Sequence, residues 1–326
     1  MATYSFQTIT AVQAGAYNGA NDSVNFGAGE AVQVTAAYLT APDQVAVSYR
    51  GQTVSFGTGV YGDLDLKFDN GAMVFVGGTG ADNAIGTAAD DAMFGGAGAD
   101  TLNGAGGGDI LQGNQGADSL VGGAGGDTVY GGQDNDAILL GVGADEANFA
   151  NGNKGDDTII ASNGIDTVLG GQGNDSIIGG SGGDFLNGNL GDDTIQGGSG
   201  ADSIAGEGGR DVISGGAGAD VFSFATGASA MDALTADRIL DWTAADRISL
   251  PVKGGYSEYG PVARDFLTAE LAGHNTMMPD PTQHILAVQL NGDVVVFADT
   301  DADTMPDVAI ILVGVSLSDL DASNFI

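Results

Sequence analysis

The sequence predicts an all-β fold, in which a solenoid of short parallel strands lies between two small β-rich regions. Three observations support this: a nine-residue period from Gly77 to Ser223, an Asp at the same place in every copy, and alternating apolar and polar residues outside the repeats. The chain has 58 Gly but only six Pro, and no Pro lies between Pro42 and Pro251. The long period and the scarcity of Pro exclude collagen.

The repeat array contains sixteen copies, such as GGAGADTLN and GGAGGDTVY. Eight copies occupy residues 77–148, a break follows at 149–151, and eight more occupy 152–223. The first position is Gly in 14 of 16 copies, the exceptions being Leu140 and Ala161. Glycine permits the tight turns and close backbone approaches that such a copy requires.

Each copy is expected to form a turn followed by a strand, and its sixth and eighth positions show this most clearly. The eighth is apolar throughout and is expected to point inward from a three-residue strand that follows a six-residue turn. Two copies would close one coil, so sixteen copies make about eight coils stacked at ~4.8 Å. The sixth position is always Asp: Asp82, Asp91, Asp100, Asp109, Asp118, Asp127, Asp136, Asp145, Asp157, Asp166, Asp175, Asp184, Asp193, Asp202, Asp211 and Asp220.

The energetics of such a copy point to a bound cation. Ordering nine residues costs more backbone entropy than one buried aliphatic side chain returns, and stacked Asp columns repel one another. The formal net charge is −35, with 38 of the 43 acidic residues being Asp. Short carboxylates among glycine turns suit a flexible all-oxygen site, which calcium prefers over magnesium.

The pattern GGxGxDxUx, as in GGAGADTLN, resembles the RTX (repeats-in-toxin, haemolysin-type) calcium-binding family. The resemblance implies a right-handed parallel β-roll, calcium ions between consecutive coils and export by a type I secretion machine. It also implies multiple sites, roughly 12–14 ions with one site between each copy and the next but one. The alternative without metal is a disordered Gly/Asp linker.

Residues 1–76 are predicted to form a small antiparallel β domain. Alternation such as Val45-Ala46-Val47 indicates half-buried strands, and Asn18-Gly19 and Asn70-Gly71 are typical of hairpin turns. We expect a last strand from Met73 to Val76 to lead into the roll.

Residues 224–326 are predicted to form a β-rich C-terminal region with a short helix over Val262–Leu271 and a hairpin through Asn291-Gly292. The ending VGVSLSDLDASNFI resembles the C-terminal region of type I-secreted RTX proteins, which implies an uncleaved secretion signal. A further calcium loop is predicted from the spacing of Asp299, Asp301, Asp303 and Asp307. The alternative is a solvated acidic loop.

The sequence contains no pattern typical of an active site. It lacks HExxH, G-x-S-x-G, a P-loop and cysteine, so we expect no enzyme activity. The acidic charge argues against nucleic-acid partners, and no apolar run is long enough for a membrane span. The N-terminus lacks the features of a cleavable signal peptide.

The ninth position should face solvent, yet it is often apolar. This suggests lateral or end-to-end contact between copies of the chain, or cover by the flanking regions. We therefore expect a secreted structural protein, extracellular or at the cell surface, which folds on calcium and self-assembles into a fibre, surface layer or biofilm matrix. The alternatives are a soluble effector or adhesin with a host or glycan partner and, less favoured, an ice-binding solenoid. The apolar ninth positions are Ile85, Phe94, Val121, Tyr130, Leu139, Ile160, Leu169 and Ile178.

Overall fold

The protein is described from a computed structural model, in which the chain forms two compact units, Met1–Asn163 and Gly164–Ile326. The structure describes residues 71–141, 146–225, 236–251, 285–299 and 307–326 in full. It describes the strands alone at 3–5, 23–25, 34–38, 45–49, 52–56, 64–67, 255–263 and 283–284.

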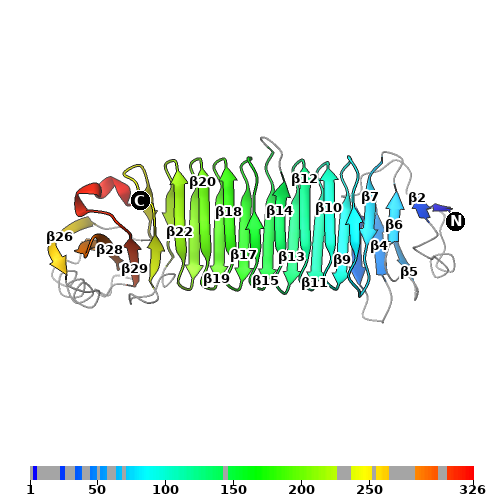
Figure 1. Ribbon diagram of the computed structural model, residues 1–326, viewed down its shortest axis with the longest axis horizontal. Coiled ribbons are helices and arrows are strands. Elements are labelled where there is room, and N and C mark those ends of the chain that lie inside the picture. The colour runs from blue at the N-terminus through cyan, green and yellow to red at the C-terminus, as the bar shows by residue number, and fades with distance from the viewer. Residues whose placement is uncertain are drawn as a thin grey trace. The chain divides into compact units, whose positions relative to one another are not determined.

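The repeats of the first unit form a parallel β-roll with two sheets (Figure 1). Each strand pairs with the strand two copies further on, as in Thr101↔Ser119, so two copies close one coil as predicted. One sheet contains β7 (Met73–Val76), β9 (Ala92–Ala97), β11 (Ile110–Gln115), β13 (Thr128–Gln133) and β15 (Phe149–Lys154). The other contains β8 (Asn83–Ile85), β10 (Thr101–Gly106), β12 (Ser119–Ala124), β14 (Ala137–Gly141) and β16 (Thr158–Ile160).

The eighth position of each copy forms the core between the two sheets. Leu102, Leu111, Leu120 and Val129 are fully buried, which confirms that this position points inward. The strands are longer than the predicted three residues, because positions one to three of the next copy continue the ladder.

The predicted break at 149–151 is wrong. These residues begin strand β15, which pairs with β13 in the register Thr128↔Phe149. The three extra residues therefore lie in the turn before β15, since a turn can lengthen whereas an insertion within a strand would disrupt the ladder. Ala150 is buried in the core, and Ala147, the residue expected there, is exposed.

The N-terminal strands are only partly antiparallel. An antiparallel sheet joins β3 (Val34–Tyr38), β4 (Val45–Tyr49) and β5 (Gln52–Phe56). In contrast, β1 (Thr3–Ser5), β2 (Ser23–Asn25) and β6 (Leu64–Lys67) pair in parallel. The expected hairpin between β6 and β7 is confirmed, and β7 pairs with β9, so it leads into the roll. Asn18-Gly19 lies outside the described residues.

In the second unit the roll continues beyond Ser223, its predicted end. One sheet contains β17 (Thr167–Gln172), β19 (Phe185–Leu190), β21 (Ser203–Gly208), β23 (Val221–Ser223) and β25 (Arg247–Ser249). The other contains β18 (Ser176–Ser181), β20 (Thr194–Ser199), β22 (Val212–Ala217) and β24 (Asp237–Ile239). The added strands β24 and β25 pair in parallel with β22 and β23.

The C-terminal residues cover the end of both sheets of this unit. Strand β24 pairs with β29 (Val308–Leu312), which continues through β28 (Asp293–Ala298) and β27 (Gln283–Leu290) to β26 (Gly255–Ala263). The hairpin of β27 and β28 through Asn291-Gly292 is confirmed. Beyond the two 3-10 turns, η2 (Leu317–Asp319) and η3 (Ala322–Asn324), Ile326 exchanges backbone hydrogen bonds with β25 and Leu250.

The short helix predicted over Val262–Leu271 is wrong at its start, because Val262 and Ala263 belong to strand β26. The rest of that range lies outside the described residues. Within the described parts of the chain, no helix is long and apolar enough to cross a membrane.

Candidate calcium sites

The Asp at position six of each copy connects neighbouring coils through one of its two carboxylate oxygens. Its Oδ1 accepts a hydrogen bond from the backbone N–H of the Asp two copies earlier. Asp100 N–H donates to Asp118 Oδ1 at 2.8 Å, and Asp118 N–H donates to Asp136 Oδ1 at 2.8 Å. The Asp side chains therefore form a ladder along each turn edge of the roll.

The second carboxylate oxygen, Oδ2, is buried and accepts no hydrogen bond in many of these residues. Such an atom is costly to bury unless a proton or a cation lies beside it. The first unit has unpartnered Oδ2 atoms on Asp100, Asp109, Asp118, Asp127 and Asp136. The second unit has them on Asp184, Asp193, Asp202 and Asp211.

The glycine at position one keeps the space beside this oxygen open. A Cβ at Gly113 would lie under 3.0 Å from Asp118 Oδ2 and from the carbonyl oxygen of Gly131, closer than real Cβ atoms approach. Gly113 therefore leaves Asp118 Oδ2 and the carbonyl oxygen of Gly131, which belongs to the next coil, facing the same space. Glycine is therefore preferred at this position because a Cβ would overlap these oxygens, and not because the backbone has a positive φ.

Burial dominates the electrostatics of these carboxyl groups. It raises the pKa of Asp109 to about 8, and the nearby carboxylates of Asp127 and Asp91 add to the effect. Burial likewise raises the pKa of Asp136 to about 8 and that of Asp193 to about 7. Near neutral pH such groups need either a proton or a cation in contact with them.

These residues fit a calcium ion. The donors are carboxylate and carbonyl oxygens only, as a hard cation requires. Within the described residues, no three His, Cys, Asp or Glu side chains gather closely enough to hold a metal, so backbone carbonyls would complete each ligand set. In the first unit the carboxylates that would hold calcium lie along two turn edges, with Asp82, Asp100, Asp118, Asp136 and Asp157 on one and Asp91, Asp109 and Asp127 on the other.

The second unit contains the same two ladders, and each ends in an Asp that was missed from the sequence. Asp211 N–H donates to Asp237 Oδ1 at 2.8 Å, and Asp220 N–H donates to Asp246 Oδ1 at 3.0 Å. The sequence signal was present, since Asp237 and Asp246 are nine residues apart and each is followed two residues later by Ile. The predicted members here are Asp166, Asp184, Asp202 and Asp220 on one edge and Asp175, Asp193 and Asp211 on the other.

Asp145 is the one repeat Asp that the structure does not place, because it lies outside the described residues. The ladder position expected for it is occupied by Asn148, whose Oδ1 accepts the N–H of Asp127 at 2.7 Å. The sequence register failed here because Asp145 matches the nine-residue spacing, whereas the ladder spacing at this point is 21 residues.

The additional calcium loop predicted at 299–307 lies mostly outside the described residues. Asp301 and Asp303 are not described, whereas Asp299 is buried at the end of β28 and Asp307 precedes β29. The Asp307 N–H donates to the carbonyl oxygen of Ala298 at 2.7 Å, so the two ends of the loop lie together. This site stays a prediction.

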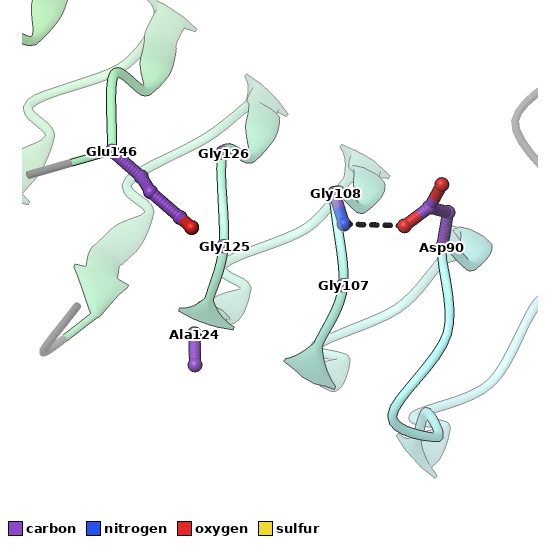
Figure 2. Close-up of a pocket in the computed structure, with 7 residues that line it drawn as sticks. All are labelled: Asp90, Gly107, Gly108, Ala124, Gly125, Gly126 and Glu146. Carbon is purple, nitrogen blue, oxygen red and sulfur yellow. Dashed lines mark hydrogen bonds between the residues drawn. The ribbon is translucent and has the colours of Figure 1, made fainter.

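A shallow pocket of about 500 Å³ lies at one turn edge of the first unit, between Asp90 and Glu146 (Figure 2). Its floor is made of glycine turns, and Asp90 Oδ1 accepts the N–H of Gly108 at 2.8 Å. Both carboxylates are exposed. Glu146 contributes, after burial, to raising the pKa of Asp127 to about 6. The pocket therefore adds negative potential that attracts cations toward the buried carboxyls.

Comparison with known protein families identifies the repeats. Residues 76–111, 112–147, 151–186 and 187–222 match the model of the RTX calcium-binding nonapeptide repeat. A solved structure, the AlgE6R3 subunit of the Azotobacter vinelandii mannuronan C5-epimerase, is 26% identical over 49% of this chain and 76% of that one, with a TM-score of 0.27. The comparison with curated proteins found no match.

Proposed function

We propose, from the premise that residues 76–147 and 151–222 are RTX calcium-binding nonapeptide repeats, that this is a secreted, non-catalytic structural protein. Its roll folds on binding several calcium ions outside the cell. The observation that carries the proposal is the row of buried Asp Oδ2 atoms without hydrogen bonds, as on Asp100, Asp118 and Asp136.

The mechanism couples metal binding to folding. Where calcium is scarce, the acidic and glycine-rich repeats stay unfolded, because the buried carboxylates repel one another and one aliphatic residue per copy cannot offset the lost chain entropy. Where calcium is plentiful, binding to the folded state supplies folding free energy. Folding outside the cell would then favour forward export through a type I secretion machine.

The first test removes calcium. Circular dichroism is expected to show the β signal lost in EDTA and restored by calcium. Trp242, the single Trp, packs against Phe222 with ring centroids 6.1 Å apart and so reports on the second unit by fluorescence. A β signal that persists in EDTA would overturn the mechanism.

A matched pair of variants sharpens this test. Asp109→Asn keeps the ladder hydrogen bond but replaces the buried Oδ2, so the calcium concentration at the folding midpoint should rise about tenfold, equivalent to ~1.4 kcal/mol. Asp90→Asn removes the same charge from the exposed pocket and should shift the midpoint far less. Equal shifts for the two variants would show that net charge, and not a buried ligand, controls folding.

We also propose that copies of the chain associate through one outer face of the first unit. At the ninth position of β8, β12, β14 and β16, this face carries an aliphatic stripe, defined as Ile85, Val121, Leu139 and Ile160. Ile85 is 67% exposed, Leu139 38% and Ile160 39%. The strand register aligns these residues in one column, interrupted by Asn103 of β10.

Within the first unit, the other two apolar ninth positions, Phe94 and Tyr130, have different surroundings, which favours lateral association through the stripe. Phe94 is buried, and Tyr130 packs against Phe149 with ring centroids 5.6 Å apart. In the second unit, the end of the roll is covered by β29 and the C-terminal residues, which disfavours end-to-end contact there. Electron micrographs of the calcium-loaded protein are expected to show fibres or sheets, and monodisperse monomers would reject association.

A further inference from the structure

One copy of the repeat in the first unit, which spans residues 140–151 in the structural register, departs from the pattern at both positions that build a calcium site. Leu140 occupies position one, where the repeat pattern has glycine. Asn148 occupies the place of the position-six Asp in the hydrogen-bond ladder. This copy also contains the three extra residues of the array. The two substitutions and the longer turn therefore coincide in a single copy.

Asn148 can make the ladder hydrogen bond of the Asp that it replaces, but it has no second carboxylate oxygen to offer a cation. Its Oδ1 accepts the N–H of Asp127, as an Asp Oδ1 does elsewhere in the ladder. Its Nδ2 donates to Ser162 Oγ at 3.0 Å and to the carbonyl oxygen of Glu146 at 3.3 Å. An amide NH₂ group is a donor only and cannot coordinate a cation. The buried polar atoms of this side chain are thus satisfied by protein groups.

Leu140 stands at position one, where glycine keeps the space beside the Asp Oδ2 open in 14 of the 16 copies. At Gly131 and Gly122, an added Cβ would lie under 3.0 Å from the Oδ2 of the Asp in the same copy. Leu140 carries a Cβ at the equivalent position and is fully buried. The pairing of β13 with β15 stays in register despite the three extra residues.

We infer that the copy 140–151 folds without calcium and interrupts the calcium column on one turn edge, the edge of Asp91, Asp109 and Asp127. The opposite edge of the first unit keeps both glycine and Asp, as at Gly131 and Asp136, and is uninterrupted. The inference rests on the proposed calcium function. At this point of the column, the hydrogen bond between Asn148 and Ser162 takes the place of a calcium ion.

The test restores the missing site. The double variant Leu140→Gly/Asn148→Asp of the full chain is expected to bind at least one more calcium ion than the natural protein, counted by native mass spectrometry and by calorimetric titration. Asn151→Asp is the matched control, because it adds one carboxylate to the same copy at the outward ninth position. This control should bind no additional calcium. An unchanged count in the double variant would overturn the inference.

Loss-of-ligand variants keep the inference testable if the double variant does not fold. Asn148→Ala, Asp145→Asn and Glu146→Gln should leave the number of bound calcium ions unchanged, whereas Asp127→Ala should lower it. A loss of calcium in any of the first three variants would show that this copy holds a metal after all. A natural protein that binds no calcium at all would instead refute the proposed function on which the inference rests.

Discussion

The Asp side chain at position six has two separate roles, one for each carboxylate oxygen. Oδ1 accepts a backbone N–H from the neighbouring coil, and Oδ2 is left buried beside a glycine. This explains the preference for Asp over the longer Glu, because the ladder hydrogen bond fixes the distance between the carboxylate and the turn. Asn148 separates the two roles, since an amide retains the first and loses the second.

The buried carboxyls predict how the calcium-free protein responds to pH. Burial raises the pKa of Asp109 and Asp136 to about 8, above the ordinary value of 3.8 that applies when the chain is unfolded. The folded state therefore binds more protons than the unfolded state, so folded stability is greatest below about pH 4 and is lost as the pH rises toward 8. Circular dichroism in EDTA should therefore show more β structure at pH 5 than at pH 8.

Calcium should reverse this dependence, because protons and calcium compete for the same oxygens. In saturating calcium, the midpoint of urea unfolding is expected to fall as the pH is lowered from 8 to 5. A β signal in EDTA that increases with pH would contradict the burial of ionisable carboxyls in the folded roll.

At the scale of one turn and strand, the glycine at position one of 14 of the 16 copies leaves no room for a Cβ. Gly113→Ala should destabilise the calcium-bound roll by about 1–3 kcal/mol, because its Cβ would overlap Asp118 Oδ2 and the Gly131 carbonyl oxygen. Gly80→Ala is the control, since nothing lies within 4 Å of its Cβ, and its effect should be within about 0.5 kcal/mol. Calcium-loaded urea unfolding measures both, and equal effects would indicate a general loss of backbone freedom.

The nine-residue period was sufficient to predict the turns, the inward residues and the pairing of alternate copies, because all three follow from local spacing. It was insufficient wherever the spacing changes. Strands β24 and β25 were missed because 26 residues, and not 18, separate Asp211 from Asp237 and Asp220 from Asp246. Similarly, Asp145 matched the period, but the backbone ladder selects Asn148. Hydrogen bonds between coils, which depend on three-dimensional register, decide these cases.

At the scale of the whole molecule, charge restricts how copies of the chain can meet. The formal net charge is −35, and the carboxylates of the repeats lie in the turns. The outer face of β8, β10, β12, β14 and β16 has no charged residue at positions seven or nine. Two copies that meet through this face avoid direct contact between carboxylates, and calcium bound in the turns lowers the remaining repulsion between them. Association is therefore expected to depend on calcium.

The stripe gives the last prediction, which concerns this association. Replacing Leu139 and Ile160 by Thr retains a good strand former while removing exposed apolar surface, so the calcium-loaded double variant should fold normally but sediment as a smaller species than the natural protein. Ile165→Thr is the control, because Ile165 is 67% exposed but lies outside the stripe, in the second unit. Sedimentation velocity in calcium and in EDTA measures the change. If the control variant dissociates as readily as the double variant, or if the natural protein is monomeric in calcium, the stripe is not the contact between copies, and the exposed side chains are left for a partner of another kind.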